Sequence, residues 1–151
     1  MSLASALPSP AGLLAVALVL MASAMPAARA ADISAPDAAA LMQAGKVTLI
    51  DIRRPDEWRQ TGVARGAVRI DMQQPGGAAG FLNAVLRQVG GDRSTPIALI
   101  CRTGNRTTQV ERFLQAQGFT HVYNIKEGMA GSAAGPGWIK RGLPVEDCAR
   151  C

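Results

Sequence analysis

Short apolar runs that alternate with helix-like segments constrain the fold of this chain more than any other feature. The runs cover residues 47–50, 67–70, 96–100 and 121–125 and are largely apolar at consecutive positions. Strands of this kind are buried on both faces, and parallel strands need a long connection, usually a helix, between them. The pattern therefore predicts an α/β fold with a central parallel sheet flanked by helices on both faces.

The segments between these runs carry helix signals. Ser34 is a candidate N-cap with Asp37 in the first turn, and Pro55 opens a second acidic first turn. Apolar residues recur at helical spacing over 81–89 and 107–117. A glycine follows each predicted helix and is expected to end it, at positions 45, 62, 90 and 118. The glycine-rich stretches 73–80 and 128–137 are predicted to be loops.

The first thirty residues have the pattern of a secretory signal peptide. An apolar run at 13–21 is too short to span a bilayer comfortably, and an A-x-A pattern ends at Ala30. No Lys or Arg precedes the run, so a retained N-terminal anchor is the alternative. We expect a signal peptide over 1–30, one domain over 31–145 and a tail over 146–151. The predicted location is periplasmic or secreted, with no membrane segment after cleavage.

The composition limits the kinds of partner that this protein is expected to bind. The 121 residues that remain after cleavage suit one domain with one core. Basic residues are scattered and aromatic residues are few, which argues against nucleic-acid binding and favours attraction of a small anion. His121 is the only histidine and is expected to be structural or exposed, so no metal site and no cofactor are predicted.

Cys101 stands at the junction between the run that ends at residue 100 and the helix that starts near Thr107. Ligands bind beyond the carboxyl ends of parallel strands. Unpaired backbone N–H groups and the helix dipole favour a negatively charged sulfur there, and Arg102 and Arg106 add positive charge. The loop is therefore the predicted active site with Cys101 as nucleophile. A buried structural cysteine is the alternative.

Several segments resemble the single-domain rhodaneses, the thiosulfate:cyanide sulfurtransferase family. They are residues 49–53 with 57–58, residues 62–67, the loop 101–106 of the form C-R-x-G-x-R, and the closing stretch 123–144. Two departures are visible. Val63 stands where the family usually has His, and the stretch 131–137 is longer than the commonest spacing before Trp138.

The resemblance implies the chemistry of the loop. Cys101 would attack the outer sulfur of an anionic donor such as thiosulfate and keep that sulfur as a persulfide, which a thiol or cyanide then removes. An arginine fork suits an oxyanion, and a glycine lets backbone amides turn toward the sulfur. The predicted substrate-binding residues are Arg102, Thr103, Gly104, Asn105 and Arg106, although Asn105 or Thr107 could simply cap the helix.

Two rival functions remain open at this point. One is a relay or redox-sensing module that carries sulfur without turnover, and the other is a phosphatase of the same superfamily. Related phosphatases place five residues between Cys and Arg, whereas four separate Cys101 from Arg106, and the tighter cradle favours sulfur over phosphate. Asp51, Arg53 and Glu57 are expected to form an ion-pair or capping network, although they could also approach the loop.

Cys148 and Cys151 form a C-x-x-C in the tail. Three interpretations stay open for this pair: a local disulfide in an oxidising compartment, a redox pair that exchanges with Cys101 or a partner, and a metal-binding or incidental tail.

Overall fold

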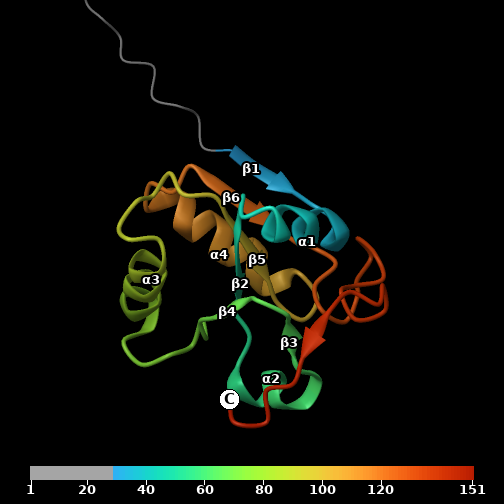
Figure 1. Cartoon of the computed structure of the whole chain (residues 1–151). Coiled ribbons are helices and arrows are strands. Elements are labelled where there is room, and N and C mark those ends of the chain that lie inside the picture. The colour runs from blue at the N-terminus through green and yellow to red at the C-terminus, as the bar shows by residue number, and fades with distance from the viewer. Residues whose placement is uncertain (1–28) are drawn as a thin grey trace, which may run out of the picture.

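The computed structural model describes residues 29–151. Five strands form one sheet in the order β1, β6, β5, β2, β4, and every neighbouring pair is parallel (Figure 1). Its members are β1 (Arg29–Asp32), β2 (Thr48–Asp51), β4 (Val68–Arg69), β5 (Ile97–Ile100) and β6 (His121–Asn124). A small antiparallel sheet pairs β3 (Val63–Ala64) with β7 (Val145–Glu146). The predicted parallel sheet is confirmed, whereas β1, β3 and β7 were not predicted.

Within residues 29–151, four helices connect the strands. They are α1 (Ala35–Gln43), α2 (Pro55–Thr61), α3 (Gly77–Gln88) and α4 (Asn105–Ala116). Ser34 caps α1 as predicted, because its Oγ accepts the Asp37 N–H at 3.2 Å. The loop predicted over 73–80 is wrong for its last four residues, which belong to α3. Gly80 permits this early start, since a Cβ there would run into the Pro75 backbone oxygen.

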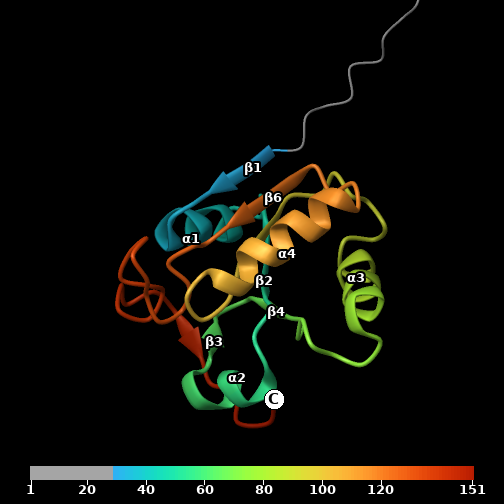
Figure 2. The same ribbon diagram turned by 180° about the vertical axis from the view of Figure 1, so that it is seen from behind.

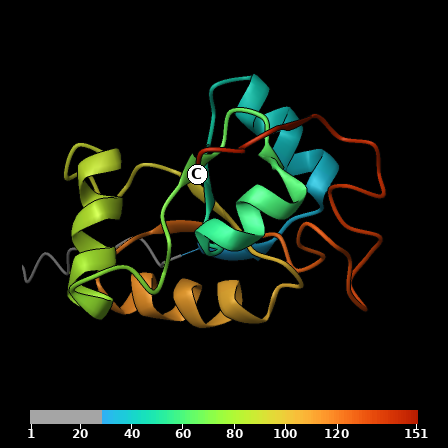
Figure 3. The same ribbon diagram turned by 90° about the horizontal axis from the view of Figure 1, so that it is seen from below.

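The sheet separates two apolar cores, with α3 and α4 on one face and α1 on the other (Figure 3). One core contains Ile50, Ile97, Leu99, Phe81, Val85, Val110 and Leu114. The other contains Leu49, Ala98, Ile100, Ala35, Ala38 and Trp138. Consecutive residues of β2 and β5 thus enter opposite cores, which is why Leu49 and Ile50 and all of Ile97–Ile100 are apolar. Figure 2 shows α4 lying across its face of the sheet.

The two ends of the described chain pack on the domain. Arg29 and Ala30 pair with His121 and Val122 in the sheet, while residues 1–28 of the predicted signal peptide lie outside the described residues. The C-terminal end lies beside α2 (Figures 1 and 2), where Cys148 packs against that helix and β3. No helix in residues 29–151 is both long enough and apolar enough to cross a bilayer.

Candidate active site

Cys101 follows β5 directly at the carboxyl edge of the sheet. In the register, Ile100 lies opposite Asp51 of β2, and Asp51 lies opposite Arg69 of β4. The ends of three neighbouring strands therefore bring a thiol, a carboxylate and a guanidinium to one edge. This is the edge at which ligands of parallel sheets bind.

The Cys101 sulfur is covered and has one backbone donor. The residue is 1% exposed, and its Sγ accepts the Gly104 N–H at 3.2 Å. The Thr107 hydroxyl lies 3.7 Å from Sγ and donates to the Gly104 carbonyl at 2.9 Å. Within residues 29–151, no second amide hydrogen-bonds to Sγ, so the expected cluster of donors is reduced to one. The loop is polar, yet Cys101 also belongs to the core shared with Ile52, so the burial that the alternative of a structural cysteine implies is present.

Backbone hydrogen bonds join the loop that carries Cys101 to a second loop, residues 126–130. The amides of Met129 and Ala130 donate to the carbonyls of Cys101 and Arg102, both at 2.9 Å. Gly104 has a φ of +86°, and a Cβ there would overlap the Lys126 backbone. Glycine is required at this position because it tolerates positive φ and leaves room for the second loop. The sequence had pointed to residues 126–130 only as part of a closing segment.

Arg106 forms a double hydrogen bond with Glu57 of α2. Its Nη1 and Nη2 each donate to a carboxylate oxygen at 2.6 Å. These bonds hold the pKa of Glu57 below its usual value, and burial opposes the shift. They also raise the pKa of Arg106, to which the charge of Asp51 contributes, while burial opposes the shift. Arg106 is thus engaged by a carboxylate rather than directed at an open site.

A second ion pair is fully buried beside the first. The side chains of Arg53 and Asp51 are 2% and 0% exposed, and Arg53 Nη2 lies 2.7 Å from Asp51 Oδ2. Arg53 also donates to Thr61 Oγ1 and to the Gly62 carbonyl, each at 2.8 Å. The predicted network of Asp51, Arg53 and Glu57 is therefore confirmed, and it fixes α2 to the end of β2.

A pocket of about 210 Å³ lies over this edge of the sheet. Its walls are Arg53, Arg54, Asp56, Glu57, Gln60, Thr61, Arg102, Met129, Ala130 and Ile139. Arg102 is exposed and makes no ion pair with a carboxylate in the described part of the chain, which leaves its guanidinium available to an anion. The predicted binding residues therefore line two different hollows, with Arg102 in this pocket. Thr103, Gly104 and Asn105 line a separate hollow of about 460 Å³ beside Lys126.

The family of this chain follows from comparison with known proteins. A family model described as the rhodanese-like domain matches residues 34–134. The chain belongs to the rhodanese-like domain family. A rhodanese domain-containing protein of Drosophila melanogaster is 30% identical over 84 residues, which cover 53% of this chain and 76% of that protein. A sulfurtransferase of Allochromatium vinosum is 28% identical over 99 residues, which cover 66% of this chain and 78% of that protein.

A solved structure shares the fold over most of this rhodanese-like chain. The polysulfide-sulfur transferase homodimer from Wolinella succinogenes superposes with a TM-score of 0.60 at 28% identity, covering 80% of each chain. The family match includes Cys101 and its loop and ends before Cys148. The tail with Cys148 and Cys151 therefore lies outside the matched range.

One carboxylate missed by the sequence analysis fixes the long stretch before Trp138. Glu127 is 2% exposed and accepts hydrogen bonds from the amides of Ala35 and Gly137 at 2.7 and 2.8 Å. It also accepts from Arg141 Nε at 2.7 Å. Burial favours the neutral acid, but these three donors outweigh it and hold the pKa of Glu127 below its usual value. The stretch 131–137 is therefore anchored to α1 and to the closing segment.

Cys148 and Cys151 form a disulfide with their Cα atoms 5.3 Å apart, as in the first of the three interpretations left open by the sequence. Among the same described residues, no three His, Cys, Asp or Glu side chains gather where they could hold a metal ion. His121 opens β6 with its Nδ1 2.9 Å from the Thr120 hydroxyl, as expected for a structural residue.

Proposed function

We propose that this protein transfers sulfane sulfur from an anionic donor such as thiosulfate to a thiol or cyanide through a persulfide on Cys101. The thiolate attacks the outer sulfur of thiosulfate, the sulfur–sulfur bond of the donor breaks, and sulfite leaves with the electron pair. The acceptor then attacks the terminal sulfur of the persulfide and regenerates the thiolate. This sequence is covalent catalysis in two displacement steps.

The observation that carries the proposal is that Cys101 and an arginine-lined pocket lie at the same carboxyl edge of the sheet, with the next residue, Arg102, in the pocket wall. The Gly104 amide donates to Sγ, and a donor of this kind stabilises a thiolate or a persulfide anion. Arg102 is part of the pocket wall, and its guanidinium suits the anionic end of the donor. The sulfurtransferase relatives support the same class of chemistry.

Reaction requires Sγ to become accessible, because Cys101 is only 1% exposed. Arg102 and Met129 are on the two paired loops and also line the pocket, so a small displacement of this wall would open a path to Sγ. The rate of alkylation of Cys101 by iodoacetamide measures that opening. Sulfite is the leaving group of the first step. At a saturating concentration it should slow alkylation if the pocket is the route to Sγ.

A thiosulfate–cyanide assay tests the proposal. Thiocyanate should form with ping-pong kinetics, and the variant Cys101→Ser should abolish its formation. Mass spectrometry after thiosulfate treatment should show the gain of one sulfur atom on the native chain and none on the variant. Turnover that survives Cys101→Ser would disprove the assignment of the nucleophile.

A sulfur-relay module is the second candidate, and the burial of Cys101 favours it. A covered persulfide is shielded from small thiols and would be released only to a partner that opens the loop. A stable gain of one sulfur atom without thiocyanate formation would select the relay over the enzyme. Hydrolysis of an aryl phosphate would instead select the phosphatase of the same superfamily.

The proposal includes export to the periplasm or the extracellular space. The signal pattern over 1–30 and the Cys148–Cys151 disulfide support it, because disulfides persist in oxidising compartments. Cleavage after Ala30 would leave Ala31 and Asp32 to pair with Tyr123 and Asn124 in β1. The intact mass of the exported protein tests this location, since a retained anchor keeps all 151 residues.

A further inference from the structure

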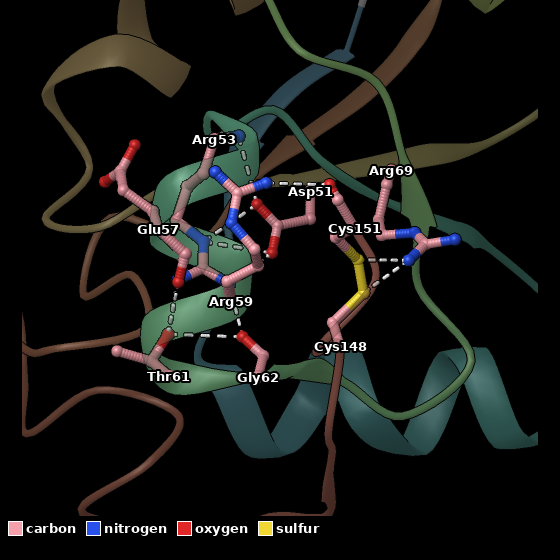
Figure 4. The surroundings of a disulfide bond; sticks show 9 residues. All are labelled: Asp51, Arg53, Glu57, Arg59, Thr61, Gly62, Arg69, Cys148 and Cys151. Atoms are coloured by element: carbon pink, nitrogen blue, oxygen red, sulfur yellow. Dashed lines mark hydrogen bonds and ion pairs between the residues drawn. A yellow bond between two sulfur atoms is a disulfide. The ribbon is translucent and has the colours of Figure 1, made fainter.

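Arg69 at the end of β4 is directed at the disulfide of the tail. Its Nη1 is in contact with the sulfur atoms of both Cys148 and Cys151 (Figure 4). Arg69 is exposed, and within residues 29–151 it makes no ion pair with a carboxylate. The two sulfur atoms are therefore the partners of this guanidinium.

A permanent positive charge affects the two redox states of the cysteine pair differently. A disulfide is neutral and a weak acceptor, whereas a thiolate is an anion that a guanidinium stabilises strongly. Arginine keeps its charge at any physiological pH. Arg69 therefore favours the reduced pair over the disulfide. Trp58 packs against Cys148, and its buried indole N–H has no acceptor among the described residues, so the same cluster holds a spare donor.

The two sulfur atoms differ in their access to solvent. Cys148 is 8% exposed and packs against Trp58 and Val63, while Cys151 is partly exposed. Arg59 Nη1 holds the main-chain oxygen of Cys151 at 2.9 Å, which fixes the turn that carries both cysteines (Figure 4). An incoming thiolate therefore reaches Cys151 first and leaves the covered Cys148 as the departing group.

We propose that Cys148 and Cys151 form a thiol–disulfide exchange site whose substrate is a thiol or dithiol reductant. The thiolate of the reductant forms a bond to Cys151 Sγ, the Cys148–Cys151 bond breaks, and its electron pair goes to Cys148 Sγ beside Arg69. A second thiolate from the reductant attacks its own sulfur in the mixed disulfide and releases Cys151. The pair gains two electrons, and the reductant becomes a disulfide.

This site is distinct from the proposed sulfur-transfer site. Its two cysteines lie outside the family match, and the exchange needs no participation of Cys101. Arg69 is nevertheless on the same edge of the sheet, two strands from β5, which corresponds to roughly 10 Å between backbones. One face of the molecule thus presents both chemistries.

The test measures the exchange equilibrium with glutathione at pH 7. The background variant Cys101→Ser leaves one cysteine pair, and maleimide trapping followed by mass spectrometry counts free thiols at each ratio of reduced to oxidised glutathione. Replacement of Arg69 by Met should shift the equilibrium at least tenfold toward the disulfide, which is about 30 mV for a two-electron couple. Arg69→Lys keeps the charge and should retain most of the native equilibrium.

Arg59→Met is the matched control, because Arg59 binds the tail through a main-chain oxygen and touches neither sulfur. Its shift should stay within twofold of the parent. Equal shifts for Arg69→Met and Arg59→Met would overturn the proposal, since both would then act through packing of the tail. A pair that stays oxidised in excess reduced glutathione would also overturn it, because that resistance marks a structural disulfide.

Discussion

Glu57 competes with the anionic donor for the guanidinium of Arg106, and the variant Glu57→Gln would reveal this competition. The carboxylate receives two hydrogen bonds of 2.6 Å from Arg106 and one of 3.1 Å from the Arg54 amide. Glutamine keeps the size and one oxygen, but its NH₂ group faces an Arg106 N–H and cannot accept from it. The variant therefore loses one charge-assisted bond and weakens the other.

The expected loss of stability follows from these contacts. A hydrogen bond to a charged group contributes about 1.5–3 kcal/mol. The Arg106 side chain is 25% exposed, so solvent screens the pair and the lower half of that range applies. We expect the free energy of unfolding to fall by about 2 kcal/mol at pH 7, which is roughly 8 °C in Tm for a domain of this size.

The released Arg106 should at the same time bind the anionic donor better. If the interaction between the freed guanidinium and thiosulfate contributes about 1.4 kcal/mol to binding, the KM for thiosulfate would fall about tenfold. Urea unfolding and steady-state kinetics on one preparation measure both effects. The matched control is Asp32→Asn, since the Asp32 side chain, 55% exposed, pairs with Lys126 and does not line the pocket. The control should leave the urea midpoint and the KM unchanged.

The pH dependence provides an independent check. Arg106 lowers the folded-state pKa of Glu57, so the pair stabilises fully above the ordinary Glu value of 4.5 and loses its effect as the carboxylate takes up a proton at lower pH. The difference in stability between native protein and Glu57→Gln should therefore be constant at neutral pH and shrink below 4.5. A KM that rises in the variant, or a difference that grows in acid, would refute the reasoning.

Three further substitutions test the scaffold, each by urea unfolding at pH 7. Arg53→Met strands the buried carboxylate of Asp51 and should cost about 3–5 kcal/mol. Glu127→Gln replaces an acceptor of three hydrogen bonds and should cost about 2 kcal/mol, with a smaller difference in acid because the pKa of Glu127 is lowered. Gly104→Ala should abolish thiocyanate formation and unfold more easily than Gly91→Ala, whose φ of +81° is similar but whose Cβ would meet open space. Equal midpoints for the two alanine variants would contradict the close approach of the loops.

The elements that could be predicted from the sequence are those with a local signature. The runs that became β2 and β5 contain consecutive apolar residues because helices cover both faces of the sheet. The cap at Ser34 and the position of Cys101 after β5 are equally local. The strands β3 and β7 have two residues each, and Ala64 pairs with Val145, 81 positions later in the sequence. Such short strands have no periodic pattern that would predict them.

The missed features of the site depend on contacts between distant segments. Glu57 and Arg106 are 49 residues apart, and their pairing follows from where α2 docks on the sheet edge. Of the two arginines predicted to bind the donor, Arg106 is therefore occupied by Glu57, and Arg102 is left available. The burial of Cys101 also depends on distant segments. Its side chain contacts Gly104 of its own loop and Thr107 of α4, but it also belongs to the apolar core that contains Ile50 and Ile52.

Glu127 makes the segment 131–137 a closed unit. Its backbone oxygen accepts the Gly131 N–H at 3.1 Å where the segment begins, and its carboxylate accepts the Gly137 N–H at 2.8 Å where the segment ends. A single residue thus clamps both stems of the excursion, and the tip between them can gain or lose residues without shifting either stem. Variation in length at this place would reshape the rim of the neighbouring hollow while the cysteine loop keeps its geometry.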